Sequence, residues 1–398
     1  MSYKQILNGM MDIYFSELEL RTSELHPEAM MNVSSSLEIV SLPLGEPLIS
    51  DHITNYILFT LSFVILLFSL PAVFFNILNV YIFVNTKLDS VTVCFISLAL
   101  SDLSAMLVLA TVSVFSTLVS FGVSWSKNLP TYSRFFIFFF TLSIDLSSAT
   151  TTYIAVQRGL CVTFPFITRH VFNKNRSLII CVAIFLVMLT IWLPRFSTFI
   201  LKTIPDPADN SSKLVVFEYF ESWNSFDYFY LIFVKSLLAV IEYVIMVICT
   251  VAISIGMKSS MKLKQKSNSY SSQTQYGTDA KKSKEEKDKK YKDETKGSEK
   301  EQGQKKDSKE LLVVKQSLIV VLIHVILTTP RILACVYQVS ERRFHVGEQF
   351  HNLYFTTHSI VNVIDATNAF VNFFVYVKFN SKYRNYLFSK IFKQRVKL

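Results

Sequence analysis

The sequence predicts an all-α membrane protein, in which seven transmembrane helices form a bundle and an amphipathic C-terminal helix follows the last of them. The 398 residues are 51% hydrophobic and only 18% charged, whereas a soluble domain of this size carries more charge. The apolar residues gather into seven runs, most of about twenty residues or more, which is the length that crosses a bilayer as a helix. The charges also lie mainly between these runs.

The charges that flank the runs indicate how the chain is oriented. Residues 1–53 hold eight acidic and two basic side chains, whereas residues 378–398 hold seven basic side chains and no acidic one. Positive flanks stay on the cytoplasmic side. We therefore expect a multi-pass protein of the plasma membrane with its N-terminus outside. Because the bases flank apolar runs and form no single patch, we expect no binding of nucleic acid.

The chain divides into five parts. Residues 1–53 form a flexible extracellular segment, residues 54–257 carry five transmembrane helices, and residues 311–379 carry two more. Residues 258–310 hold 16 lysines and 10 acids, which predicts a basic cytoplasmic loop that is disordered or transiently helical. Residues 380–398 form the amphipathic juxtamembrane helix and tail. The predicted spans are 56–84, 91–118, 135–157, 178–194, 228–256, 316–337 and 353–377.

Smaller features agree with this topology. Apolar side chains recur at helical spacing after residue 380, with lysines and arginines between them, which predicts a helix lying on the inner leaflet of the lipid bilayer. Of three N-glycosylation sequons, those at Asn32 and Asn210 lie in segments expected outside, whereas the one at Asn175 is expected inside and should stay unmodified. All five cysteines lie in or beside apolar runs, so no extracellular disulfide framework is expected.

Polar side chains inside the predicted spans indicate a connected site, because such groups are costly at membrane depth. Asp102 lies in the second span, Ser147 in the third, and Asn368 and Asn372 in the seventh. A lone carboxylate in a helix bundle needs a cation, a proton or hydrogen-bond donors. The cluster predicts either a small oxygen cage around a cation or a hydrated polar network that contains no ion.

Several motifs of this chain resemble those of rhodopsin-like receptors, which bind an extracellular ligand and activate a heterotrimeric G protein. The third span ends at Arg158, Leu98–Asp102 resembles the second-helix motif, and Asn372–Tyr376 resembles the seventh-helix motif with Phe373 in place of the usual proline. Pro330 resembles the sixth-helix proline. The resemblance covers roughly residues 55–392, and it implies the fold and the activity of these receptors.

The resemblance also assigns roles to particular residues. It implies a coupling switch in which Arg158 holds Glu310 and then releases it, with Pro165 and Tyr376 as further members. The alternative for a lone arginine at a membrane edge is snorkelling towards water. Gln157 stands where the family usually has an acid, so we expect weaker restraint on Arg158 and raised basal activity. The sodium-binding positions of the family correspond to Asp102, Ser147, Asn368 and Asn372.

Ligand-binding candidates lie in the half of the spans expected to face outwards, and they are Arg331, Lys235, Asn362 and Asp365. A buried arginine or lysine can bind a carboxylate of an extracellular small molecule or peptide. Internal ion pairing, such as Lys235 with Asp145 or Glu242, is the alternative that remains open. The family's amine-binding aspartate corresponds to Phe140, so a biogenic-amine ligand is not expected.

Within the family, the sequence of residues 158–165 and 372–384 is similar to that of molluscan and nematode chemosensory receptors and FMRFamide-type peptide receptors. Two further positions depart from the family, since Thr328 replaces a tryptophan and Ser133 replaces a disulfide cysteine. No catalytic motif is present, so we expect no enzyme activity, and sodium is the one cofactor considered. A different class remains as the alternative, a seven-span ligand-gated channel subunit of inverted topology.

Overall fold

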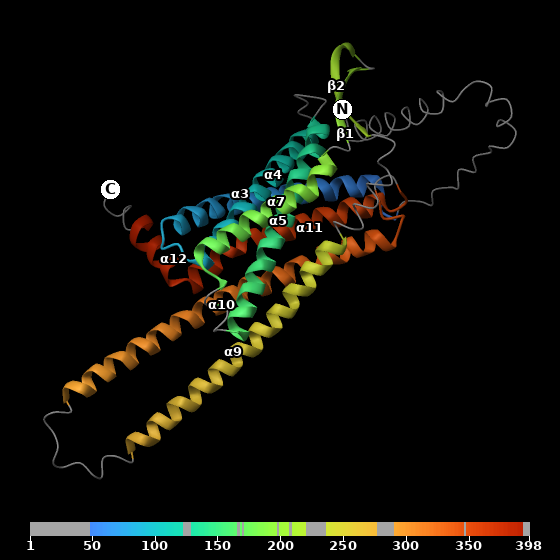
Figure 1. The fold of residues 1–398 in the computed structure, drawn as a ribbon. Helices are drawn as coiled ribbons and strands as arrows, with labels where there is room; N and C mark the ends of the chain where they lie inside the picture. Colours follow the sequence, from blue (N-terminus) through green and yellow to red (C-terminus); the bar gives the residue numbers. More distant parts are fainter. Residues whose placement is uncertain are drawn as a thin grey trace.

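The described part of the chain is a bundle of long helices with a two-stranded hairpin at one end (Figure 1). Within it, seven helices are long and apolar enough to cross a membrane, which confirms the predicted fold class. The computed structural model describes residues 48–121, 129–164, 168, 171–196, 199–206, 209–219, 236–276, 290–345 and 348–392. The helices are α3 (Asp51–Val84), α4 (Ser90–Ser120), α5 (Leu129–Thr163), α7 (Lys174–Phe196), α9 (Ala239–Tyr276), α10 (Lys290–Ser340) and α11 (His351–Phe379).

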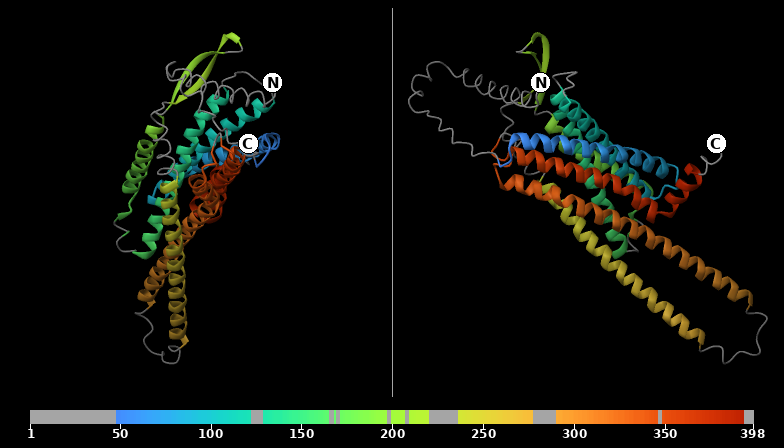
Figure 2. Two further views of the ribbon diagram at one scale, coloured as in Figure 1. Left: turned by 90° about the vertical axis from the view of Figure 1, so that its right-hand side faces the viewer. Right: turned by 180° about the vertical axis from the view of Figure 1, so that it is seen from behind.

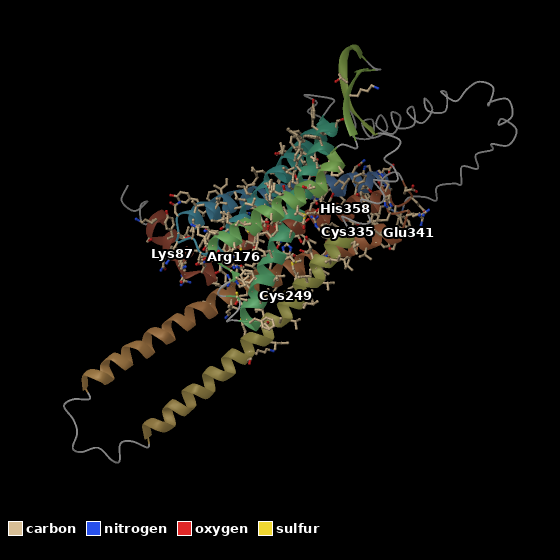
Figure 3. The ribbon with its side chains drawn as sticks, in the orientation of Figure 1. Lys87, Arg176, Cys249, Cys335, Glu341 and His358 are labelled. Atoms are coloured by element: carbon tan, nitrogen blue, oxygen red, sulfur yellow. The ribbon has the colours of Figure 1, made fainter. Side chains whose placement is uncertain are left out.

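The two ends of the bundle differ in structure. One end carries the antiparallel hairpin of β1 (Phe199–Asp206) and β2 (Asp209–Tyr219), which the sequence analysis did not predict. We call it the hairpin end. At the opposite end, α11 is followed by α12 (Ser381–Tyr386) and by the π-helical turn η3 (Leu387–Phe392), and we call this the α12 end. Lys87 and Arg176 lie towards the α12 end, and Glu341 and His358 towards the hairpin end (Figure 3).

The basic segment 258–310 is helical over the ranges that the structure describes. Helix α9 continues to Tyr276, and α10 begins at Lys290, while residues 277–289 lie outside the described residues. The two helices run beyond the rest of the bundle as a pair of arms (Figure 2). The predicted sequon residue Asn210 lies on β2, although its side chain is not described. Asn32 lies outside the described residues.

Helix α11 runs without interruption from His351 to Phe379. A proline in the place of Phe373 would lack the backbone N–H that continues the helix. Phe373 retains this group, and its ring stacks on that of Phe75 with 4.2 Å between the ring centroids. Small buried side chains, Ala72 of α3 and Ala366 and Ala369 of α11, belong to the same apolar cluster. Such residues let transmembrane helices approach closely.

Helix α12 is fixed to the bundle by polar contacts. Lys382 Nζ lies 3.0 Å from Asp89 Oδ2, and Asp89 also caps α4 by accepting a hydrogen bond from the Thr92 backbone. Burial acts to raise the pKa of Asp89, but the hydrogen bonds from Thr92 and Lys382 hold it below its ordinary value. Tyr383 donates from its hydroxyl to Asn79 Oδ1 at 2.7 Å. These contacts connect α12 to α3 and α4.

Helices α5 and α9 approach closely at Gly256. A Cβ atom built on Gly256 would lie 2.0 Å from Val162 Cγ1, so a larger side chain requires Val162 or the two helices to shift. We expect Gly256→Ala to lower the free energy of unfolding by about 1–3 kcal/mol, measured by thermal unfolding of the purified protein. The matched control is Gly159→Ala, because its added Cβ would lie 3.6 Å from Cys249 Sγ, an ordinary contact. Equal stability of the two variants would contradict this account of the packing.

Candidate functional site

A hydrogen-bonded group in the middle of the bundle joins three helices. The Ser147 hydroxyl of α5 donates to Asp102 Oδ1 of α4 at 2.5 Å, and the Asn372 amide of α11 donates to Asp102 Oδ2 at 3.0 Å. Asp102 is 3% exposed. The structure therefore brings together three of the four residues that were predicted as a sodium site, and it gives each carboxylate oxygen one donor.

The fourth predicted residue, Asn368, has a different partner. Its amide nitrogen lies 2.9 Å from Nδ1 of His324 on α10. Because an amide nitrogen can only donate, Nδ1 of His324 accepts and Nε2 carries the proton. His324 is buried, and its Nε2 has no hydrogen-bond partner among the described residues. Sequence reasoning missed this pair, although an imidazole within a span was itself a signal of a polar partner.

A buried ion pair joins α10 and α11 nearer the hairpin end. Arg331 donates from Nη2 to Asp365 Oδ2, and both side chains are largely buried. These are two of the four predicted ligand-binding residues, so their first partner in this conformation is each other. Internal ion pairing was the alternative left open in the sequence analysis, and Lys235, the example given there, lies outside the described residues. The remaining candidate, Asn362, is half-buried and does not line the cavity described next.

The ion pair, Asp102 and Ser147 line one small cavity of about 30 Å³. This is room for one water molecule or a monatomic ion, and far less than an organic ligand needs. Its wall includes the side chains of Asp102, Asp145, Glu242, His324, Arg331 and Asp365. Hard cations prefer oxygen ligands, so the carboxylate of Asp102 and the hydroxyl of Ser147 fit sodium. Asn372 presents its nitrogen to Asp102 and therefore supports the carboxylate as a donor.

At the α12 end, Arg158 is 8% exposed, and its Nε and Nη2 have no hydrogen-bond partner among the described residues. The neighbouring Gln157 turns away towards α4 and α7. Its Nε2 donates to Ser90 Oγ at 2.6 Å, and Ser90 Oγ lies 2.6 Å from Ser177 Oγ. The predicted contact of Arg158 with Glu310 stays a prediction, because only the backbone of Glu310 is described. Pro165 lies outside the described residues.

The α12 end is closed by a buried apolar cluster, beside which several polar side chains have no hydrogen-bond partner among the described residues. Val320 and Val321 of α10 belong to the same buried cluster as Ile154 of α5 and Tyr376 of α11. The Tyr376 hydroxyl, and both amide atoms of the fully buried Gln316, find no hydrogen-bond partner among the described residues. Leaving such groups buried and unpaired costs about 1–3 kcal/mol each. A conformation that opens this end would let them gain partners.

Comparison with known families decides the identity. A sequence model described as "7 transmembrane receptor (rhodopsin family)" matches residues 76–376, which is more than half of the chain. The chain belongs to this family. It is thus a class A G-protein-coupled receptor, a multi-pass membrane protein that responds to an extracellular ligand and activates heterotrimeric G proteins, and it is not an enzyme. The comparison with curated proteins found no match.

The receptor departs from its family where the sequence analysis noted departures. All five cysteines of the chain lie among the described residues, and none of them forms a disulfide. Thr328, in place of the family's tryptophan, is buried in the cavity wall. Next to it, Thr329 Oγ1 of α10 lies 2.8 Å from the Tyr243 hydroxyl of α9, a contact that sequence reasoning did not find.

Proposed function

We propose that this receptor lies in the plasma membrane with its N-terminus and hairpin end outside and its α12 end inside. The acidic segment 1–53 and the basic tail 378–398 support this orientation. Lys382 and Arg384 of α12 are exposed at the α12 end, where Lys382 also contacts Asp89. In this orientation they would face the anionic lipid headgroups of the inner leaflet. The orientation also presents the α12 end to the G protein.

We propose that its ligand is a chemosensory cue or a neuropeptide that carries an anionic group. The resemblance to molluscan and nematode receptors motivates the ligand class. Phe140, at the amine-binding position, is buried in an apolar cluster, so it offers no counter-ion to an amine. An anionic ligand group competes with Asp365 for Arg331, because guanidinium binds carboxylates with two parallel hydrogen bonds. Lys235 and Asn362 are further candidates for this site.

The observation that carries the mechanism is the connection between α4, α5 and α11 at Asp102. It lies between the Arg331–Asp365 pair, nearer the hairpin end, and buried Arg158 at the α12 end. In the proposed sequence, ligand binding breaks the ion pair and α10 moves away from α5. Arg158, Gln316 and Tyr376 then gain partners on the G protein. Glu310 and Pro165 complete the coupling switch. Sodium beside Asp102 and Ser147 would neutralise the carboxylate and so favour the closed form.

The test combines topology with signalling. An epitope tag placed before residue 1 should be accessible to antibody on intact cells, and a panel of G-protein pathway reporters should respond to the chain with or without a ligand library. A channel subunit of inverted topology would instead hide the tag and pass ionic current. A hidden tag together with silence across all G-protein reporters would overturn the proposal.

Gln157 provides a sharper prediction about basal activity. Because its side chain binds Ser90 rather than Arg158, the guanidinium lacks the neighbouring carboxylate that is usual in the family. We expect Gln157→Glu to lower basal nucleotide exchange about tenfold, since a hydrogen bond to a charged group contributes about 1.5–3 kcal/mol. The measurement is basal exchange per receptor at the cell surface. Gln157→Met is the control, because it removes the same amide without supplying a carboxylate, and it should not lower exchange.

A further inference from the structure

Helix α10 carries three polar contacts within two turns, and they lie on both sides of Pro330. His324 and Thr329 come before the proline, and Arg331 follows it directly. Proline lacks a backbone N–H, so α10 loses one of its own hydrogen bonds here and can bend. Side-chain contacts on either side of such a point determine how the two halves of the helix are held.

Two of the contacts form a ladder between α10 and α11. On α10, His324 and Arg331 are seven residues apart and so share one face. On α11, their partners Asn368 and Asp365 are three residues apart and also share one face. His324 pairs with Asn368 at 2.9 Å and Arg331 pairs with Asp365, as antiparallel helices require. The ladder therefore bridges Pro330 and holds both halves of α10 to α11.

The third contact holds α10 to α9. Thr329 Oγ1 donates to the Val325 carbonyl at 2.8 Å, so its single hydroxyl proton is used. The Tyr243 hydroxyl, 2.8 Å away, must then be the donor to Thr329 Oγ1. A hydrogen bond donated by α9 therefore holds α10 at the residue immediately before Pro330.

We propose that the pairs His324–Asn368 and Tyr243–Thr329, together with the Arg331–Asp365 pair, form a polar clasp that sets the position of α10 and holds the receptor closed. Thr328 lacks the aromatic ring of the tryptophan that it replaces, and we infer that the polar clasp positions α10 instead. This inference rests on the proposed function, because it assumes that movement of α10 opens the α12 end to a G protein. His324, Asn368, Tyr243 and Thr329 are thus positioning residues.

The clasp makes a prediction that packing alone does not make. If His324 and Asn368 act as a pair, Asn368→Leu leaves the buried His324 without a partner and His324→Leu leaves the half-buried Asn368 without one, and each should raise the ratio of open to closed receptor about tenfold. The double variant removes both partners, so its effect should not exceed that of either single variant. Side chains that act only by filling space would show roughly multiplied effects in the double variant.

The α9 contact allows a conservative rescue. Thr329→Val and Tyr243→Phe each remove one hydroxyl and should shift the ratio in the same direction and by a similar factor. Thr329→Ser keeps the hydroxyl, so it should behave as the wild type. Ile326→Ala is the control, because Ile326 lies in the same two turns of α10 but is 59% exposed and does not line the cavity. It should leave both the ratio and the thermal stability close to those of the wild type.

The experiment measures the position of α10 directly. Spin labels are attached to Lys87→Cys, in the loop before α4, and to Leu312→Cys on α10, both exposed towards the α12 end. Cys161 and Cys249, the two half-buried native cysteines, are replaced by alanine in the full-length chain. Pulsed dipolar spectroscopy in lipid nanodiscs then gives the closed and open distance populations. The wild type should be mostly closed, and the four single variants should gain the longer distance.

A parallel assay of nucleotide exchange separates the two proposals. Shifted distances in the variants, with no exchange on any G protein, would uphold the clasp and contradict the proposed coupling. Exchange by the wild type, with unchanged distances in all clasp variants, would overturn the clasp and leave the coupling. Multiplied effects in the double variant, or a failure of Thr329→Ser to match the wild type, would also overturn it.

Discussion

Replacing Asp365 by alanine is expected to lower the free energy of unfolding by about 3–5 kcal/mol, which is the usual cost of leaving one member of a buried ion pair without its partner. The reason is local to α10 and α11. The guanidinium of Arg331 is largely buried in the cavity wall, and its Nε already lacks a hydrogen-bond partner among the described residues. Thermal unfolding of the purified receptor in nanodiscs measures the loss.

The double variant Arg331→Met/Asp365→Leu is the matched control for this prediction. It removes both charges and keeps similar volume, so its stability should lie close to that of the wild type. A single variant that is as stable as the double variant would show that the pair is hydrated and bears no burial cost. An anionic ligand that binds through Arg331 should also lose its affinity in the double variant.

Asp102→Ala is expected to cost about 3 kcal/mol of unfolding free energy, because the Ser147 hydroxyl and the Asn372 amide both lose a charged acceptor. The same position decides between a sodium site and a network without an ion. Sodium chloride should raise the thermal midpoint above that in choline chloride of equal concentration. At about tenfold excess over its dissociation constant, the ion would stabilise the wild type by roughly 1.4 kcal/mol.

Asp102→Asn is the control for the ion, since it keeps the shape of the side chain and removes the charge. This variant should lose the difference between sodium and choline while still folding. No difference between the two salts in the wild type would favour the polar network without an ion. A difference that survives in Asp102→Asn would place the ion elsewhere, for example beside Glu242 in the same cavity.

The fold and part of the site could be predicted from the sequence because they depend on features that are local along the chain. Apolar runs of membrane length predict the seven helices. Asp102, Ser147 and Asn372 each stand at a recognisable place in their spans, so their meeting at the centre of the bundle followed from the motifs. The hydrogen bond of Gln157 to the Ser90 hydroxyl could not be predicted from the motifs, because it depends on Ser90 and Ser177 from two other helices.

The parts that were missed depend on the rotation and relative height of helices. Internal ion pairing was an open alternative with Lys235 as its example, whereas the described pair is Arg331 with Asp365. His324 was visible within its span, yet only the register of α10 against α11 shows that it meets Asn368. The β1–β2 hairpin lies in an acidic segment with little apolar alternation at its start, so its pairing register could not be seen in advance.

The central claim is that buried Arg158 becomes the contact for a G protein when α10 moves. The most direct measurement is nucleotide exchange on purified heterotrimeric G proteins by the full-length receptor in nanodiscs, compared with its Arg158→Ala variant. We predict exchange above the receptor-free rate for the wild type with at least one G protein, and a loss of about tenfold or more in the variant. Equal exchange by the two proteins, or none by the wild type with every G protein, would contradict the account.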